Sequence, residues 1–210
     1  YILQNNNTMK KAFLTFTLLV LSLYMPAQDD YDNKIEELYD NREYETIIEE
    51  YAFKDTDYSA GSLFFIATAY HMLGDDNNCI KYCDLSLEKN SSNSGAYHIK
   101  ATSLNYLEKY EEAVPFFQRA IVLESEKEHI AKSYRGMGYS YYTLKLYDQA
   151  LDAYNKAIEM DKTVAIPYVM IAQIYAATDK KDKVLDAYYR GKENASKEAK
   201  EYITILFNIG

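Results

Sequence analysis

The chain has 210 residues, of which 48% are hydrophobic and 26% are charged. This composition is that of an ordinary globular protein and is too apolar for a disordered one. The net charge of -9 argues against a nucleic-acid backbone as partner, and two cysteines are too few for a scaffold held together by disulfides.

The N-terminal part has the pattern of a secretory signal peptide. Two lysines follow Met9, an apolar run covers residues 12–23, and the small residue Ala27 ends the segment. A basic start, a short apolar run and a small residue before the cleavage point are the three parts of such a peptide. The run is shorter than the roughly 18 residues expected of a membrane span. We therefore predict a signal peptide over residues 9–27.

This prediction divides the chain and gives the protein a location. Residues 1–8 are polar and rich in Asn, and we expect them to lie upstream of the real start or to be disordered. The mature chain would be residues 28–210, without an integral membrane span, and it would be periplasmic or associated with the cell envelope. The alternative is that the apolar run is kept as an uncleaved N-terminal anchor.

Small side chains recur along the rest of the chain at a nearly constant interval. The first set is separated by 34, 37 and 34 residues and lies at Ala67, Ala101, Gly138 and Ala172. Two further small sets keep the same phase, at Cys79, Ala113, Ala150 and Val184 and at Ser86, Ala120, Ala157 and Gly191. Larger residues alternate with them, at Leu63, Tyr97, Tyr134 and Tyr168, at Tyr70, Leu104, Tyr141 and Tyr175, and at Cys83, Phe117, Tyr154 and Tyr188. Helices approach to roughly 8–10 Å where the side chains between them are small, so the pattern predicts stacked helix pairs.

The segment Ala131–Val164 resembles a tetratricopeptide repeat (TPR), a helix–turn–helix unit whose template reads W-x2-L-G-x2-Y, then A-x3-F, then P. The matching positions are Tyr134, Met137, Gly138, Tyr141, Ala150, Tyr154 and Lys162. Tyr134 replaces the Trp of the template, and Lys162 replaces its closing Pro. The resemblance implies an all-α fold, a right-handed superhelical solenoid of antiparallel helix pairs with a C-terminal capping helix.

The same phase divides the mature chain into units. We place repeats at residues 28–59 (degenerate), 60–93, 94–130, 131–164 and 165–194, followed by a capping helix at 195–209. About three extra residues near 124–130 explain the interval of 37, either as a longer second helix or as a lengthened turn. The capping helix is expected to pack on the preceding helix through an apolar face formed by Ala199, Tyr202, Ile203, Leu206 and Phe207.

The first unit is acidic. It carries 12 Asp and Glu against 3 Lys and Arg, a net charge of -9 out of -11 for residues 28–210. Terminal repeats are commonly atypical because one face meets water, so these charges fit a solvated cap. The alternative is an acidic patch for a basic partner.

Signatures of catalysis are missing from the sequence, which has no nucleophile elbow, zinc-protease motif or phosphate-binding loop. Gly136 and Gly138 lie inside a predicted helix, where close helix packing explains Gly138 better than contact with a phosphate. His71, His98 and His129 fall in three different settings, which argues against a metal site. We therefore predict a protein that is not an enzyme and needs no cofactor or metal.

Three further side chains occupy predicted core positions. Cys79 and Cys83 are one helical turn apart and are expected to be buried free thiols. A disulfide is the alternative, which adjacent turns of one helix disfavour. Lys100 replaces an apolar residue of the other repeats, so its stem should pack while its ammonium reaches solvent or a carboxylate.

In the family that the chain resembles, the first helix of each repeat lines a concave groove that holds ligand peptides. Carried over to this sequence, the resemblance assigns the groove to Phe64, Thr68, His71, His98, Asn105, Arg135, Tyr139, Tyr142 and Gln173, together with Thr102, Val169 and Ala176. Only Asn105 and Arg135 could serve in the clamp with which some members hold a C-terminal carboxylate. The expected surface is aromatic and neutral, which suits a protein or peptide. The alternative is that the tyrosines only cover the core.

The predicted function is that of an exported, non-enzymatic scaffold that binds a protein or peptide in its concave groove. One alternative is a structural subunit of a cell-envelope assembly that contacts its partners through its edges. Another is a small-ligand binder or an unrecognised enzyme, which a deep closed pocket with convergent polar groups would favour.

Overall fold

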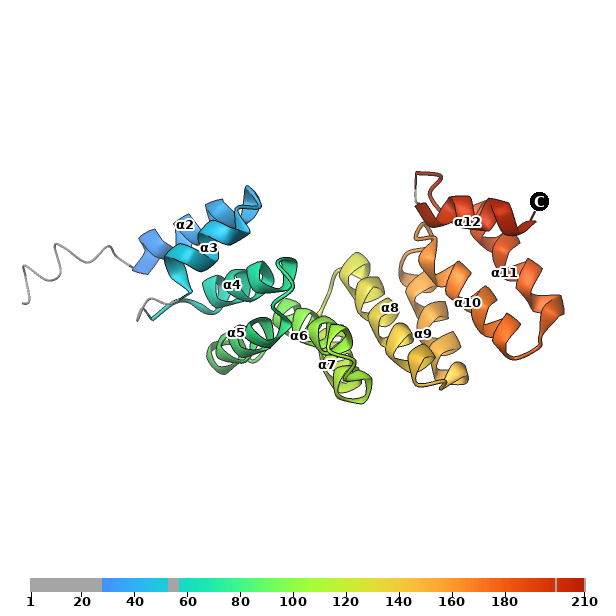
Figure 1. The fold of residues 1–210 in the computed structure, drawn as a ribbon, viewed down its shortest axis with the longest axis horizontal. Coiled ribbons are helices and arrows are strands. Elements are labelled where there is room, and N and C mark those ends of the chain that lie inside the picture. Colours follow the sequence, from blue (N-terminus) through green and yellow to red (C-terminus); the bar gives the residue numbers. More distant parts are fainter. Residues whose placement is uncertain (1–27, 53–56, 199, 210) are drawn as a thin grey trace, which may run out of the picture.

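The computed structural model describes residues 28–52, 57–198 and 200–209, and this part of the chain contains eleven helices and no strand (Figure 1). The helices are α2 (Gln28–Asp40), α3 (Tyr44–Tyr51), α4 (Ala60–Met72), α5 (Asp76–Lys89), α6 (Ser94–Tyr106), α7 (Tyr110–Leu123), α8 (Lys127–Thr143), α9 (Tyr147–Met160), α10 (Ile166–Ala177), α11 (Lys181–Asn194) and α12 (Lys200–Ile209). The predicted signal peptide, residues 9–27, and residues 1–8 lie outside the described residues.

Consecutive helices pack in pairs, and the pairs stack along the long axis of the molecule (Figure 1). Helix α4 contacts α5, α6 contacts α7, α8 contacts α9, and α10 contacts α11. Successive pairs are joined by contacts between α5 and α6, α7 and α8, and α9 and α10. The prediction of an all-α, right-handed superhelical solenoid of antiparallel helix pairs is confirmed.

A tight turn of constant geometry joins the two helices of each pair. One residue of the turn has a positive φ, and these residues are Arg42, Gly74, Glu108, Lys145 and Asp179. In each turn the next N–H donates to the carbonyl five residues before it, as in a Schellman motif. From Gly74 onward the turn residues are separated by 34, 37 and 34 residues, the same intervals as the small side chains. The backbone and the side-chain pattern therefore share one period.

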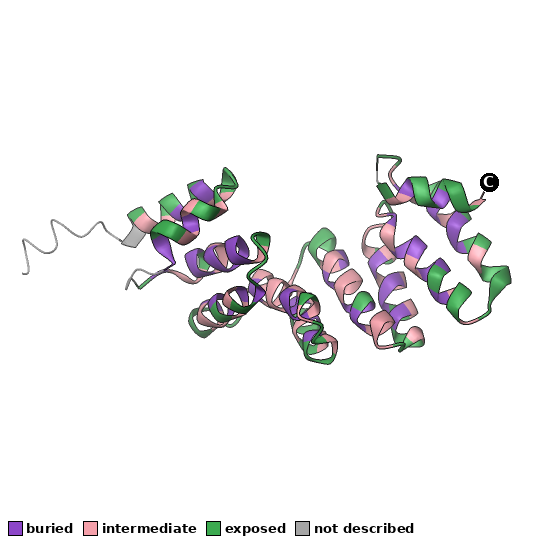
Figure 2. Ribbon diagram, viewed as in Figure 1, coloured by how far each residue is buried: buried purple, intermediate pink, exposed green. Residues whose placement is uncertain are grey.

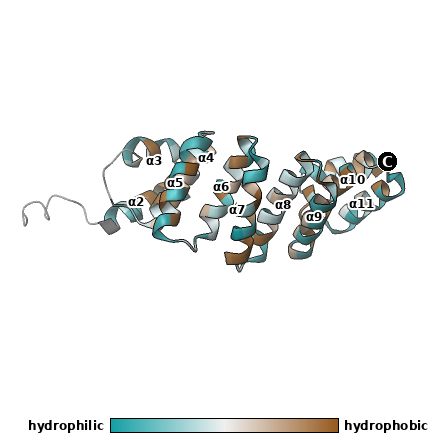
Figure 3. Ribbon diagram, turned by 90° about the horizontal axis from the view of Figure 1, so that it is seen from below, coloured by the Kyte–Doolittle hydropathy of each residue, from teal (hydrophilic) through white to brown (hydrophobic). Residues whose placement is uncertain are grey.

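Small residues lie at the contacts between helices. Ala67, Ala101 and Ala172 are fully buried on α4, α6 and α10. A Cβ at Gly138 on α8 would lie 2.9 Å from the Tyr154 ring of α9, so no larger residue fits without a shift. Figure 2 shows buried residues in every helix of the stack, and Figure 3 shows apolar and polar residues alternating along the helices. The core is therefore a continuous series of contacts between neighbouring helices.

The extra residues before α8 lengthen that helix. Helix α8 has 17 residues, against 13 in α6 and 12 in α10, and only three residues separate it from the end of α7. Both sequence-based alternatives, a longer second helix and a lengthened turn, are therefore wrong. The insertion adds about one turn at the N-terminus of a first helix, because residues 127–130 have no Gly or Pro and continue the helix.

Helix α12 covers the end of the stack, with contacts to α10 and α11. Its buried residues are Tyr202 and Ile205, whereas Ile203 is 70% exposed and Phe207 85% exposed. The predicted packing face was therefore wrong for Ile203, Leu206 and Phe207, and Ala199 lies outside the described residues. Two apolar stripes run along this helix, and Ile205 is buried because Gly191 of α11 leaves room for it.

Candidate functional site

Two depressions lie along the first helices of the pairs. Depression 1, of about 400 Å³, is lined by α6, α8 and α10, with Phe117 of α7 and Tyr154 of α9 at its base. Depression 2, of about 390 Å³, is lined by α4, α6 and α8, with residues of α2 and α7. His98 and Lys132 line both. The two depressions therefore adjoin and form one groove, of a size within the roughly 300–1,000 Å³ of ligand sites.

His98 lies where the two depressions adjoin, and its side chain is uncharged at neutral pH. Nδ1 of His98 lies 2.9 Å from Oγ of Ser133, and its ring meets the Phe117 ring edge-on at 5.7 Å. Burial, and after it the positive charges of Arg135 and Lys132, lower the pKa of His98 from 6.5 to about 4. At neutral pH the fixed charge here is therefore that of Lys132 and Arg135.

Depression 1 combines aromatic walls with a free cation. Tyr139 is 45% exposed and meets the Tyr110 ring edge-on at 6.1 Å. Arg135 has no hydrogen bond or ion pair with any residue that the structure describes. Arg135 is the one positively charged residue among those predicted from the sequence to line the groove. Its guanidinium is available to a ligand.

Asn105 also lines depression 1, and its amide makes two hydrogen bonds within the protein. Nδ2 donates to the carbonyl of Gly136 at 3.2 Å, and Oδ1 accepts from the hydroxyl of Ser140 at 2.8 Å. These bonds join α6 to α8. Asn105 therefore helps to fix the spacing of the two helices and keeps one N–H and one oxygen lone pair for a ligand.

His71 belongs to a separate polar cluster. Its Nδ1 lies 2.8 Å from Oδ1 of Asp76 and 3.0 Å from Oγ of Ser103. A Ser–His–Asp relay needs the two partners on opposite ring nitrogens, and here both contact the same one. The cluster therefore joins α4, α5 and α6 and does not activate a nucleophile.

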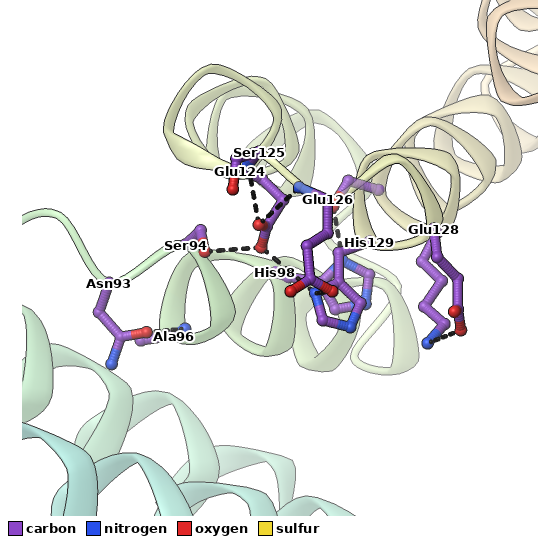
Figure 4. A network of polar contacts seen from close by, with 11 residues as sticks. Asn93, Ser94, Ala96, His98, Glu124, Ser125, Glu126, Glu128 and His129 are labelled. Carbon is purple, nitrogen blue, oxygen red and sulfur yellow. Dashed lines mark hydrogen bonds and ion pairs between the residues drawn. The ribbon is translucent and has the colours of Figure 1, made fainter. Parts of the chain in front are cut away.

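Glu124, in the loop between α7 and α8, lines depression 2 and belongs to a network of polar contacts (Figure 4). Glu124 accepts from the hydroxyl of Ser94 at 2.9 Å and from the backbone N–H of Ser125 and Glu126 at 2.8 and 3.1 Å. Partial burial opposes its ionisation, but these donors outweigh burial and lower the pKa of Glu124. His129 lies 3.4 Å from the same carboxylate. Glu124 is therefore a fixed anion that shapes the loop.

The structure divides the predicted groove residues into two groups. Those that line a depression are Phe64, His98, Asn105, Arg135, Tyr139 and the additional candidate Thr102. The others lie outside both depressions. Thr68 is buried and donates its hydroxyl to the Phe64 carbonyl, His71 belongs to the cluster with Asp76 and Ser103, and Tyr142 packs near Tyr147. Val169 is buried, and Gln173 and Ala176 are exposed. Binding of a peptide by any of them stays a prediction.

Two series of groove residues were missed from the sequence. One series is Gly95, Lys132 and Ile166, and the other is Phe65, Ile99, Gly136 and Met170. The members of each series are separated by 34 or 37 residues, as the repeats are. Assigning one member of a series to the groove would therefore have predicted the others. Phe117 and Tyr154 were taken as core residues, and they are buried, but each also forms part of the floor of depression 1.

The expectations for Cys79, Cys83 and Lys100 are confirmed. The two thiols are free and buried, with their sulfur atoms 4.0 Å apart. The ammonium of Lys100 lies 2.5 Å from Oδ1 of Asp84, and it also lies over the Phe116 ring at 4.2 Å. Among the described residues there is no cluster of metal ligands, and no described helix is long and apolar enough to cross a membrane.

A family model described as tetratricopeptide repeat matches residues 94–163. No curated protein matches the chain in sequence. A crystal structure of MamA superposes with a TM-score of 0.62 at 20% identity, over 81% of this chain and 95% of that one. A structure of MamA from Desulfovibrio magneticus RS-1 gives 0.68 at 17% identity, over 80% and 96%.

A third similar structure is that of the APC/C hetero-tetramer Cut9-Hcn1, with a TM-score of 0.69 at 17% identity, over 85% of this chain and 35% of the other. Similarity at this level of identity establishes the fold. Residues 94–163 match the tetratricopeptide-repeat family, and the described part of the chain shares the solenoid fold of these structures. Solenoids of stacked repeats form extended concave surfaces.

Proposed function

We propose that the protein is a non-enzymatic scaffold that binds a protein or peptide in the groove formed by depressions 1 and 2. The main support is the continuity of the groove across α4, α6, α8 and α10. An extended segment can lie across several first helices at once, and aromatic walls supply contact area at low entropic cost. Among the residues that line the depressions, the one Ser–His contact is that of His98 with Ser133, and Ser133 is only 2% exposed.

Two tyrosines of nearly equal exposure allow a controlled test. Tyr139 is 45% exposed in depression 1, and Tyr189 is 47% exposed on α11, outside both depressions. Crosslinking in the cell followed by mass spectrometry should identify a partner that is captured by the wild type and by Tyr189→Ala but lost with Tyr139→Ala. Equal capture by both variants would exclude the groove as the binding surface.

A second proposal is that the protein is a structural subunit that contacts its assembly through its ends. Its support is the uncovered apolar stripe of α12, where Ile203 and Phe207 are exposed, and the acidic first unit at the other end. Under this proposal Phe207→Ser or Glu36→Lys would remove the partner, whereas Tyr139→Ala would leave it bound. No observation favours a small-ligand site or an enzyme over these two proposals.

We also propose that the protein acts after export, in the periplasm or at the cell envelope. The support is the sequence of residues 9–27, which has the basic start, short apolar run and small final residue of a signal peptide. N-terminal sequencing of the protein purified from its source should give Gln28 as the first residue. A chain that keeps residues 12–23 in the membrane fraction would instead support the uncleaved anchor.

A further inference from the structure

Depression 1 gathers positive charge in a protein whose net charge is -9. Lys132 and Arg135 line it, and the described residues of its wall include no Asp or Glu. Lys132 is paired with Glu128 of the same helix at 2.8 Å, whereas Arg135 has no such partner among the described residues. One uncompensated guanidinium therefore faces this half of the groove.

A second donor faces the same space. The side chain of Tyr154 is only 1% exposed, and its hydroxyl has no hydrogen-bond partner among the described residues. Among the described residues, every fully buried side-chain N or O atom has a hydrogen-bond partner. The unpartnered hydroxyl of Tyr154 is therefore not fully buried. Tyr154 lines depression 1, so that depression is the space to which the hydroxyl is exposed. Burial raises the pKa of Tyr154, so the hydroxyl carries its proton at neutral pH. A buried O–H without an acceptor is a donor that a ligand can satisfy.

The walls around these two donors are largely apolar, although Thr102, Asn105 and Lys132 also line the depression. Phe117, Tyr139, Ile166 and Met170 surround them, and His98 is neutral. The site therefore suits a group with an aliphatic stem that ends in an acceptor of charge -1. A carboxylate accepts from a guanidinium and from a hydroxyl at the same time, and it matches the single free positive charge. A phosphate, with a charge near -2, would exceed that charge.

We propose that depression 1 is a specificity pocket for the carboxylate of a Glu or Asp side chain within an extended segment of the partner protein. Arg135 and Tyr154 hold the carboxylate, and the apolar walls hold the stem and the neighbouring residues. This inference rests on the proposed function and adds the type of side chain that the groove selects.

The test starts from random peptides displayed with their C-termini fused to the carrier, so that no terminal carboxylate is free. A selected peptide is then made with both ends blocked, in forms that carry Glu, Gln or phosphoserine at the selected acidic position. Fluorescence polarisation gives its affinity for the wild type, Arg135→Gln, Tyr154→Phe and the control Arg119→Gln, an exposed arginine of α7 outside both depressions. Circular dichroism confirms that each variant keeps its helices.

We expect the Glu form to bind the wild type about tenfold more tightly than the Gln form, as charge-assisted hydrogen bonds do. Arg135→Gln should abolish this ratio, Tyr154→Phe should reduce it, and Arg119→Gln should leave it unchanged. Peptides that bind without an acidic preference, or a Glu-to-Gln ratio that survives Arg135→Gln, would overturn the pocket and leave groove binding intact. Tighter binding of the phosphoserine form would overturn the assignment to a carboxylate. The absence of any binding peptide would overturn both the pocket and the proposed function.

Discussion

The substitution Gly136→Ala tests whether small residues set the spacing of the stack. An added Cβ would lie 2.5 Å from Cζ and 2.6 Å from Cε1 of the Phe117 ring, so the ring would have to move by almost 1 Å to reach ordinary contact. Phe117 is fully buried and meets the His98 ring at 5.7 Å, so a shift of its ring disturbs that contact. Overpacking of this kind costs about 1–3 kcal/mol. Alanine recovers about 0.5–1 kcal/mol through its higher helix propensity.

The expected result is a net loss of about 0–2.5 kcal/mol in the free energy of unfolding, measured by urea denaturation with far-UV circular dichroism. The matched control is Gly61→Ala on α4, where the nearest atom to the added Cβ is Oγ of Ser59 at 3.6 Å. It should be neutral or slightly stabilising. In a Phe117→Leu background the penalty of Gly136→Ala should largely disappear, since the ring that it meets is gone. Equal stability of Gly136→Ala and Gly61→Ala, or an unchanged penalty without the ring, would refute the packing argument.

Three further predictions follow from the same contacts. The folded-state pKa of His98, about 4, is below its unfolded value of 6.5, so the unfolded chain binds more protons between these values and stability should fall as the pH falls from 6.5 to 4. The difference between wild type and His98→Gln across this window should be about 1–3 kcal/mol in urea titrations, the lower values reflecting the partial exposure of the ring. Lys100→Met should change stability by less than about 1 kcal/mol, because Asp84 is half exposed and can return to water; a loss above 2 kcal/mol would show that the ion pair matters more than its packing. Ile205→Ala should cost about 2–5 kcal/mol, whereas Phe207→Ser should stay within about 0.5 kcal/mol, and the reverse order would contradict the observed face of α12.

The fold could be predicted because its physical cause is periodic. Two helices can approach closely only at small side chains, so the intervals between Ala67, Ala101, Gly138 and Ala172 carry the stacking pattern. The turns left a weaker signal. Among the described residues, four of the five with a positive φ are not glycine, so composition alone did not mark these turns. The stack imposes on them a conformation that a free chain would avoid.

The face of α12 could not be predicted for a different reason. Tyr202 and Ile205 form one apolar stripe, and Ile203 and Phe207 form another, so helical spacing fits both. The choice between them depends on the surface of the previous pair. A Cβ at Gly191 would lie 2.7 Å from Ile205, and the hydroxyl of Tyr202 donates to the carbonyl of Lys192 at 3.2 Å. Such complementarity between elements does not appear in the pattern of either element alone.

The groove was partly predicted, because its chemistry is set position by position on a constant scaffold. Equivalent positions of successive repeats lie next to one another in a solenoid, so one substitution changes the character of the groove at one place. Lys132 stands where the neighbouring repeats have Gly95 and Ile166, and Arg135 stands where they have His98 and Val169.

The cationic centre therefore belongs to a single repeat, whereas the repeat before it contributes the carboxylate of Glu124 to depression 2 and the repeat after it contributes Ile166 and Met170 to depression 1. A partner that places its acidic side chain against α8 must then place its neighbouring residues against α6 and α10. The position of one arginine thus fixes the register in which an extended segment can bind, while the aromatic walls would accept several registers equally.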